Sequence, residues 1–308
     1  MYNFTLKKGG KDKMGLVYIN GEFVPTENAK ISVFDRGLLY GDGVFEGIRS
    51  YNGSVFKLKE HLERLYASAK AVWLNIPLSF KEMEEAVIET VRVNNLKDSY
   101  IRLIVTRGQY GLGIDPWECK EGTVIIIADK IKVFPEEFYQ TGLNAVTVAT
   151  RRSPTDVLDP RIKSLNYMSN ILARIEARIA GAAEGIMLNH QGYVTEATVD
   201  NIFFVKKGIL FTPSVTLGAL PGITRATVME LAQKELGLEV VEGFFTRYDL
   251  YNADEVFLTG TAVEIISVIK IDERIIGNGK PGEITQKIRR VFHDYANSGV
   301  AGSPVYGK

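Results

Sequence analysis

The residues whose types and spacing most clearly suggest ligand binding lie between Glu196 and Arg225. Here Leu220-Pro-Gly222-Ile-Thr-Arg225 leads into a run of apolar residues at helical spacing, which predicts a helix that opens at Gly222. The first amides of a helix have no partner inside it, and together with the helix dipole they bind phosphate. Gly222 would let a ligand approach the backbone closely, and the Thr224 hydroxyl could add a donor. The pattern indicates phosphate binding, although an ordinary capped helix would look the same.

A second candidate site is Tyr100-x-Arg102, in a segment rich in Ile and Val that is expected to form a strand. Residues two apart on a strand point to the same face. A phenol beside a guanidinium can bind a carboxylate, because a planar guanidinium pairs well with two carboxylate oxygens. The sequence therefore predicts a carboxylate-binding pair on this strand.

Several other kinds of chemistry find no support. The three histidines, His61, His190 and His293, are scattered, and none has metal-ligand spacing. There is no Gly-x-Ser-x-Gly or Walker motif, and Gly41-x-Gly43 precedes a strand where a dinucleotide site needs a helix. The single cysteine excludes an intrachain disulfide and a cysteine-rich zinc site. With 37 basic and 37 acidic residues the net charge is zero, which argues against nucleic acid as a partner.

Strands and helices are mixed along the whole chain, with hairpins in place of a regular βαβ alternation, which predicts an α+β fold. Helices are expected at 57–74, 80–94, 166–180, 224–236 and 284–296. The 166–180 helix carries Tyr167, Ile171, Ile175 and Ile179 on one apolar stripe. Strands are expected at 16–20, 22–25, 31–34, 43–51, 100–106, 123–128, 145–149, 185–188, 202–205, 240–242, 256–258 and 265–269.

The length of 308 residues suggests two domains. Pro135 and the adjacent acids change the local pattern, so we place a small N-terminal domain at 1–130, a linker at 131–138 and a large C-terminal domain at 139–308. The segment 107–122 holds four glycines and is expected to be an extended, functional loop. No transmembrane helix is expected, and residues 1–15 have four lysines but no apolar signal core, so we expect a cytoplasmic protein.

The signature Glu196-Ala-Thr-Val-Asp-Asn201-Ile-Phe-Phe, with Leu210-Phe-Thr212-Pro and Leu220-Pro-Gly222-Ile-Thr-Arg225, resembles that of the class IV aminotransferases, the fold-type IV pyridoxal-phosphate (PLP) enzymes. Upstream, the segment from Asp35 to Arg49 resembles the branched-chain amino acid aminotransferases. The resemblance implies two α/β domains with PLP in the cleft between them. It also implies ping-pong exchange of the amino group between L-leucine, L-isoleucine or L-valine and 2-oxoglutarate.

The resemblance also assigns roles around the cofactor. Lys163, in Lys163-Ser-Leu-Asn166-Tyr167, would bond covalently to PLP and move the substrate proton. Glu196 would hold the pyridinium nitrogen, Tyr167 the phenolic oxygen and Arg64 the phosphate. The further cofactor contacts implied are Asn201, Gly222, Ile223, Thr224 and Thr261.

For the substrate, the resemblance assigns Arg102 to the second carboxylate of glutamate or 2-oxoglutarate, and Tyr100 to the α-carboxylate. The turn Thr259-Gly-Thr261-Ala262 would bind the α-carboxylate through backbone amides, and Tyr40, Phe45 and Gly47 would line the side-chain pocket. In the family the loop equivalent to 107–122 crosses to the neighbouring subunit. A homodimer or higher homo-oligomer is therefore implied.

Two alternatives stay open at this point. On the same fold, the chain could be a D-amino acid or (R)-amine transaminase or an aminodeoxychorismate lyase, and Arg107 in Val-Thr-Arg107-Gly resembles those groups. Tyr100-x-Arg102 and Phe45-Glu-Gly47 favour the branched-chain enzymes instead. The other alternative is a binding protein that has lost the chemistry, against which the joint presence of Lys163, Glu196 and Arg64 argues.

Overall fold

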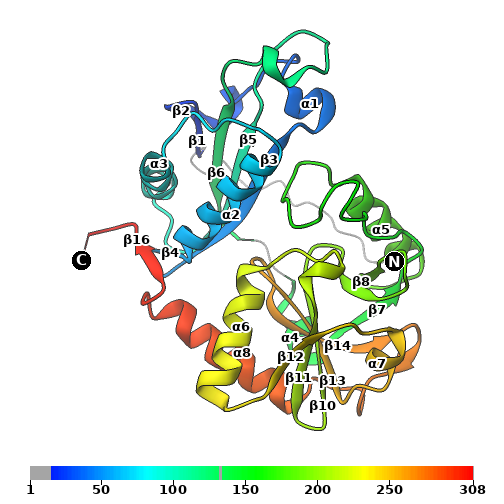
Figure 1. Cartoon of the computed structure of the whole chain (residues 1–308). Helices are drawn as coiled ribbons and strands as arrows, with labels where there is room; N and C mark the ends of the chain where they lie inside the picture. Colours follow the sequence, from blue (N-terminus) through cyan, green and yellow to red (C-terminus); the bar gives the residue numbers. More distant parts are fainter. Residues whose placement is uncertain (1–14, 132–133, 308) are drawn as a thin grey trace.

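The computed structural model describes residues 15–131 and 134–307, so the lysine-rich N-terminal segment and part of the expected linker lie outside the described residues. Two β-sheets organise this part of the chain (Figure 1). The first sheet has the strand order β16-β4-β3-β5-β6-β1-β2 and is antiparallel throughout. Its strands are β1 (Leu16–Ile19), β2 (Glu22–Pro25), β3 (Gly43–Tyr51), β4 (Ser54–Phe56), β5 (Ser99–Thr106), β6 (Thr123–Asp129) and β16 (Gly302–Pro304).

Two tight hairpins of this sheet turn at Asn-Gly pairs. Asn20 and Gly21 join β1 to β2, and Asn52 and Gly53 join β3 to β4. All four residues have positive φ, between 48° and 97°. Tight hairpin turns require this left-handed backbone, which asparagine and glycine adopt more readily than other residues.

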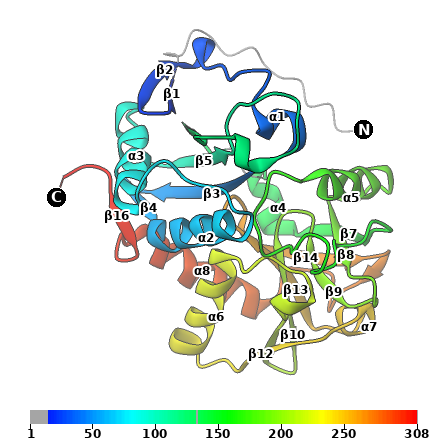
Figure 2. The ribbon, with the colours of Figure 1, turned by 45° about the horizontal axis from the view of Figure 1, so that its top comes forward.

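Two amphipathic helices cover the first sheet. The helix α2 (Leu58–Ala71) packs on β3, and α3 (Phe80–Val93) packs on β1, β5 and β6. Figure 2 shows α2 on the side of the sheet that faces the second half of the chain. Ser79 caps α3 through a capping box with Glu82, which satisfies amides at the start of the helix. The short α1 (Arg36–Tyr40) precedes β3.

The second sheet has the order β12-β11-β10-β13-β14-β7-β8-β9, with β15 paired to β14. The pairs β11·β12, β7·β14 and β7·β8 are parallel, and the others are antiparallel. The strands are β7 (Leu143–Thr147), β8 (Glu184–Leu188), β9 (Val194–Ala197), β10 (Asn201–Lys206), β11 (Ile209–Pro213), β12 (Val240–Gly243), β13 (Glu255–Gly260), β14 (Glu264–Ile271) and β15 (Arg274–Ile275).

The helices of the second half pack on this sheet. α6 (Ile223–Leu236) and α8 (Glu283–Asn297) lie side by side against β13, and α5 (Met168–Ile179) packs on β7 and β8. The remaining helices are short: α4 (Glu136–Thr141) and α7 (Arg247–Tyr251), with 3-10 turns η1 (Thr26–Asn28), η2 (Pro116–Glu118) and η3 (Val215–Leu217). No helix among the described residues is long and apolar enough to span a membrane.

Two expectations from the sequence are wrong in detail. The segment 31–34 forms no strand; it is a turn region in which Val33 is 68% exposed and Phe34 48% exposed. α5 begins at Met168, and its apolar stripe faces outward: Ile175 is 49% exposed and Ile179 83% exposed. In both places the apolar residues lie on the surface of the single chain, where the sequence pattern suggested a core.

The last strand also departs from the expected division. Residues 302–304, which we placed in the C-terminal domain, pair with β4 as the edge strand β16 of the first sheet. Figure 1 shows the chain returning to that sheet after α8. The sheet changes between β6 and β7, and the linker at 131–138 stays a prediction.

Candidate active site

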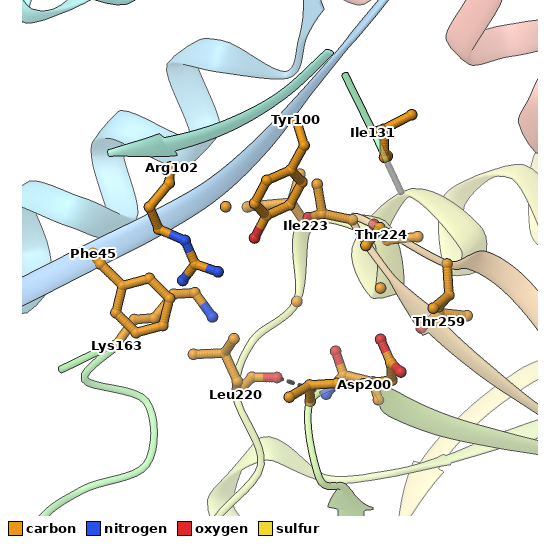
Figure 3. A pocket seen from close by; sticks show the side chains of 18 of the residues that line it. Phe45, Tyr100, Arg102, Ile131, Lys163, Asp200, Leu220, Ile223, Thr224 and Thr259 are labelled. Atoms are coloured by element: carbon orange, nitrogen blue, oxygen red, sulfur yellow. Dashed lines mark hydrogen bonds between the residues drawn. The ribbon is translucent and has the colours of Figure 1, made fainter. Parts of the chain in front are cut away.

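A cavity of about 540 Å³ lies between the two halves of the chain, with walls from β3, α2 and β5 on one side and from the second half on the other. Figure 3 shows Phe45, Arg102 and Lys163 grouped across the cavity from Asp200 and Thr259. Every residue predicted for the site lines this cavity except Glu196 and Tyr40: Phe45, Gly47, Arg64, Tyr100, Arg102, Lys163, Tyr167, Asn201, Gly222, Ile223, Thr224, Thr261 and Ala262.

Lys163 is held against the first sheet by its own backbone. Its carbonyl accepts a hydrogen bond from the Phe45 amide at 2.9 Å, and the Leu165 amide donates to Gly43 at 2.9 Å. Its Nζ lies 3.2 Å from the Tyr167 hydroxyl and 4.7 Å from the centre of the Phe45 ring. Lys163 forms no ion pair with any residue of the described ranges. An amine in this position is free to react with a ligand in the cavity.

Glu196 lies directly behind the cavity wall. Its carboxylate is 2.6 Å from Arg152 Nη2 and accepts hydrogen bonds from the Leu220 amide at 2.9 Å and Asn201 Nδ2 at 3.2 Å. A carboxylate has about four lone-pair sites, so about one acceptor position is left over. Arg152, which holds the carboxylate, was not found by sequence reasoning, because it stands far from Glu196 in the chain and belongs to no motif.

The N-terminus of α6 is open toward the cavity. Gly222 is its N-cap and forms no side-chain capping bond, and the first helical hydrogen bond runs from the Ala226 amide to the Gly222 carbonyl. The amides of Ile223 and Thr224 therefore precede the hydrogen-bonded turns. A Cβ at position 222 would lie 2.0 Å from Asn201 Oδ1, so only glycine fits here. These amides suit an anion such as phosphate.

Arg64 extends from α2 to this helix end. Its Nη1 donates to the Pro221 carbonyl at 2.7 Å, while Nε and Nη2 each donate to Glu46 at 2.8 Å. The alternative pairing with Glu60 does not occur, because Glu60 pairs with Lys57. Glu46 was not among the predicted site residues, although it lies in the Phe45-Glu-Gly47 motif; its signal is an acidic residue inside strand β3.

The charges of this cluster are fixed by burial and pairing. Burial alone would raise the pKa of Glu46, but the charge and hydrogen bonds of Arg64, with a hydrogen bond from His61, outweigh it and lower that pKa to about 2. Burial lowers the pKa of His61 in spite of the neighbouring carboxylate. His61 is therefore neutral near pH 7, and its Nδ1–H donates to Glu46 Oε2 at 2.8 Å.

At the other end of the cavity, Tyr100 and Arg102 lie on one face of β5, as expected. The Arg102 guanidinium lies 4.7 Å from the centre of the Phe45 ring and 5.4 Å from that of Tyr100, and it has no ion pair within the described part of the chain. Burial raises the pKa of Tyr100 although Arg102 opposes this, so the phenol keeps its proton. Both side chains are therefore available to bind a carboxylate.

Gly47 makes room for Tyr100. A Cβ built on Gly47 would lie 2.3 Å from the Tyr100 hydroxyl oxygen, closer than any real contact. The turn that carries Thr261 and Ala262 is in turn fixed by Arg49, which lies 2.9 Å from Glu264 and donates to the Ala262 carbonyl at 3.3 Å. Residues of both halves thus set the shape of the substrate end.

Two residues considered from the sequence lie elsewhere. Tyr40 is 41% exposed on α1, and its hydroxyl donates to the Leu112 carbonyl at 2.5 Å, outside the cavity. Arg107 is buried and pairs with Asp42 at 2.7 Å, with further bonds to the carbonyls of Val72 and Trp73. Its guanidinium fixes the start of the 107–122 loop and does not line the cavity.

Asp200 is a lining residue that sequence reasoning did not single out. Its Oδ2 is buried without a hydrogen-bond partner among the described residues. Burial, with the nearby Glu184 and Glu196, raises its pKa to about 8, although Arg174 and Lys163 oppose the shift. Asp200 therefore carries a proton near neutral pH.

The chain is similar to known proteins over most of its length. Residues 43–271 match the family model of class IV aminotransferases. A Methanocaldococcus jannaschii protein with the provisional name branched-chain-amino-acid aminotransferase is 54% identical over 278 residues, which cover 90% of this chain and 95% of the relative.

Solved structures match over the same length. The crystal structure of the Escherichia coli branched-chain amino acid aminotransferase has a TM-score of 0.92 and 38% identity, covering 96% of this chain and 100% of that one. The T.th. branched-chain amino acid aminotransferase in complex with N-(5'-phosphopyridoxyl)-L-glutamate has a TM-score of 0.88 and 40% identity, covering 93% and 95%. The chain therefore belongs to the class IV aminotransferases, with the fold-type IV architecture that its sequence signature predicted.

Proposed function

We propose that this protein is a PLP-dependent transaminase that exchanges the amino group between L-branched-chain amino acids and 2-oxoglutarate by a ping-pong mechanism. One observation carries the proposal: a single cavity brings together Lys163, the open N-terminus of α6 and the Tyr100–Arg102 pair. These three features supply a reactive amine, a phosphate site and a carboxylate site. Together they match the needs of transamination.

The residues present fit the cofactor. The open amides at Ile223 and Thr224, with Arg64 and Thr261 beside them, would hold the phosphate. Glu196 has an acceptor position left for the proton of the ring nitrogen, and Arg152, 2.6 Å from its carboxylate, holds that carboxylate in place. When bound, PLP supplies the electron sink for removal of the proton at the substrate α-carbon.

The chain's own groups would handle this proton. Lys163 Nζ would take it from the α-carbon and return it to the cofactor, which requires a neutral amine at that moment. The Tyr167 hydroxyl, 3.2 Å from Nζ, would accept a hydrogen bond from the amine and orient it. Phe45 covers the same amine and keeps water away from it.

The substrate end of the cavity can accept both an apolar and an acidic substrate side chain. Phe45 offers an apolar surface, and Arg102 beside it offers a charge for a second carboxylate. The T.th. relative has been solved both with an L-glutamate adduct of the cofactor and with 4-methylvaleric acid, an acidic and a branched aliphatic compound. We assign both to one pocket in this chain, as ping-pong exchange requires.

The test is a half-reaction screen. The purified protein should be yellow, and L-leucine and L-valine should bleach it faster than D-alanine or (R)-1-phenylethylamine. Lys163→Ala should abolish both the colour and the turnover. Faster reaction with D-alanine or the amine would contradict this proposal and favour a D-amino acid or (R)-amine transaminase. The inward pairing of Arg107 with Asp42 does not favour that alternative.

We further propose a homodimer that works in the cytoplasm. Large apolar side chains are exposed on α1, on the 107–122 loop and along α5: Leu38 is 62% exposed, Ile114 78% and Ile179 83%. Exposed apolar surface of this extent is typical of an interface between chains. Arg36 orders the loop by donating to the carbonyls of residues 113, 114 and 115, so the apolar tip is already formed in the single chain.

A further inference from the structure

Arg64 has five N–H donors, and the structure shows how three of them are used. Glu46 accepts from Nε and from Nη2, both at 2.8 Å, and the Pro221 carbonyl accepts from Nη1 at 2.7 Å. Two N–H groups, one on each terminal nitrogen, have no partner among the described residues. Because Arg64 lines the cavity beside the open end of α6, these are the groups that a bound phosphate can meet.

Glu46 determines which two groups are left. Its carboxylate is completely buried and holds the guanidinium along one edge, so the planar group cannot rotate about its long axis. His61, also buried, donates from Nδ1 to Glu46 Oε2 at 2.8 Å and fixes the carboxylate in turn. The order of contacts is therefore His61, Glu46, Arg64 and then the ligand.

The charges of His61, Glu46 and Arg64 bear on how this cluster can bind an anion. Glu46 is ionised and Arg64 is positive, so together they carry no net charge, and His61 is neutral. A negative group so close to an anion site weakens the long-range attraction for phosphate. Charge-assisted hydrogen bonds depend strongly on geometry. The carboxylate of Glu46 is therefore explained if orienting the Arg64 donors adds more to phosphate affinity than the neutralised charge takes away.

We propose that Glu46, supported by His61, is a positioning residue for the phosphate of the ligand and acts by orienting two N–H groups of Arg64. The proposal rests on the proposed function only for the phosphate-bearing ligand. Removal of the negative charge of Glu46 should therefore weaken the binding of an anion, although the loss of a negative charge alone would strengthen it.

The experiment uses the full chain freed of cofactor. Binding of pyridoxamine 5'-phosphate and of pyridoxamine is measured by calorimetry, since neither has the aldehyde that would react with Lys163. For Glu46→Gln we expect the affinity for pyridoxamine 5'-phosphate to fall about 10- to 100-fold, with the affinity for pyridoxamine unchanged within about twofold. His61→Gln should weaken phosphate binding in the same direction but less.

Two further variants separate positioning from general damage. In an Arg64→Met background, Glu46→Gln should cause no further loss of phosphate affinity, because the group it orients is gone. Asp272→Asn is the matched control: Asp272 is a partly buried acid held by hydrogen bonds from Thr147 and Tyr251, it does not line the cavity, and its substitution should leave both affinities unchanged.

The outcomes are distinguishable. Equal or tighter binding of pyridoxamine 5'-phosphate by Glu46→Gln would overturn the proposal, and so would an equal loss for both ligands or a loss that persists in Arg64→Met. If Glu46→Gln does not fold, His61→Gln decides by the same comparison. If the unaltered protein itself binds pyridoxamine 5'-phosphate no better than pyridoxamine, the proposed function fails instead.

Discussion

Gly47→Ala tests whether the position of Tyr100 sets the rate of the reaction. The added Cβ would lie 2.3 Å from the Tyr100 hydroxyl oxygen, whereas an ordinary contact needs at least 3.4 Å, so the hydroxyl must withdraw by about 1.1 Å. Gly47 does not have positive φ, so alanine fits its backbone without strain. The expected effect is therefore confined to the contact with Tyr100.

The size of the effect follows from that displacement. A catalytic or binding group misplaced by about 1 Å costs about 100-fold in rate, or about 2.7 kcal/mol of activation free energy. Tyr100 is assigned to the α-carboxylate, which both substrates carry, so the half-reactions with L-leucine and with 2-oxoglutarate should slow by similar factors. Single-turnover measurement of the bound cofactor's colour reports each half-reaction separately.

Two variants make the prediction sharper. Tyr100→Phe removes the hydroxyl and leaves the ring Cζ as the nearest atom, 3.0 Å from the new Cβ, so Gly47→Ala should cost less than tenfold in that background. Gly307→Ala is the control, since no atom lies within 4 Å of its Cβ. Rates for Gly47→Ala within twofold of the unaltered protein, or an equal loss with and without the hydroxyl, would refute the reasoning.

Three more predictions follow from the site and the surface. Arg102→Ala should slow the half-reaction with 2-oxoglutarate about 10- to 100-fold more than that with L-leucine; equal losses would assign Arg102 to the α-carboxylate. Asp200 keeps its proton from its ordinary pKa of 3.8 up to about 8, while the unfolded chain releases it, so the melting temperature of the cofactor-free protein should fall as pH rises across that range. Asp200→Asn should flatten this slope, and unchanged slopes would contradict the assignment. Ile114→Asp should shift the assembly toward monomer in sedimentation at equal concentration, and an unaltered distribution would remove this loop from the interface.

Local patterns predicted much of the fold. β3 runs from Gly43 to Tyr51 as expected, because its β-branched and aromatic residues are followed directly by the Asn52-Gly53 turn. α2 and α3 follow from the spacing of their apolar residues. The outward face of α5 was misread since an apolar stripe looks the same whether it packs on its own chain or lies at the surface.

The site was predicted in a different way. The family resemblance assigned Lys163, Asn201 and Gly222 to one site, because a resemblance to a family carries that family's geometry with it; all three line the cavity. Glu46 and Arg152 were missed, although both hold a predicted residue in place. Each acts across a long stretch of chain, 18 residues from Glu46 to Arg64, and no local pattern marks a buried ion pair of this kind.

The return of the C-terminus to the first sheet affects how that half of the chain can fold. Val305 is completely buried in the core beneath α2 and α3, and its amide donates to Gly53 while its carbonyl accepts from Arg92. During synthesis β1 to β6 emerge first, but the strand beside β4 and one of its core side chains emerge only after β7 to α8. The edge of β4 therefore stays unpaired until those elements have been made, and residues 15–131 alone lack a part of their own core.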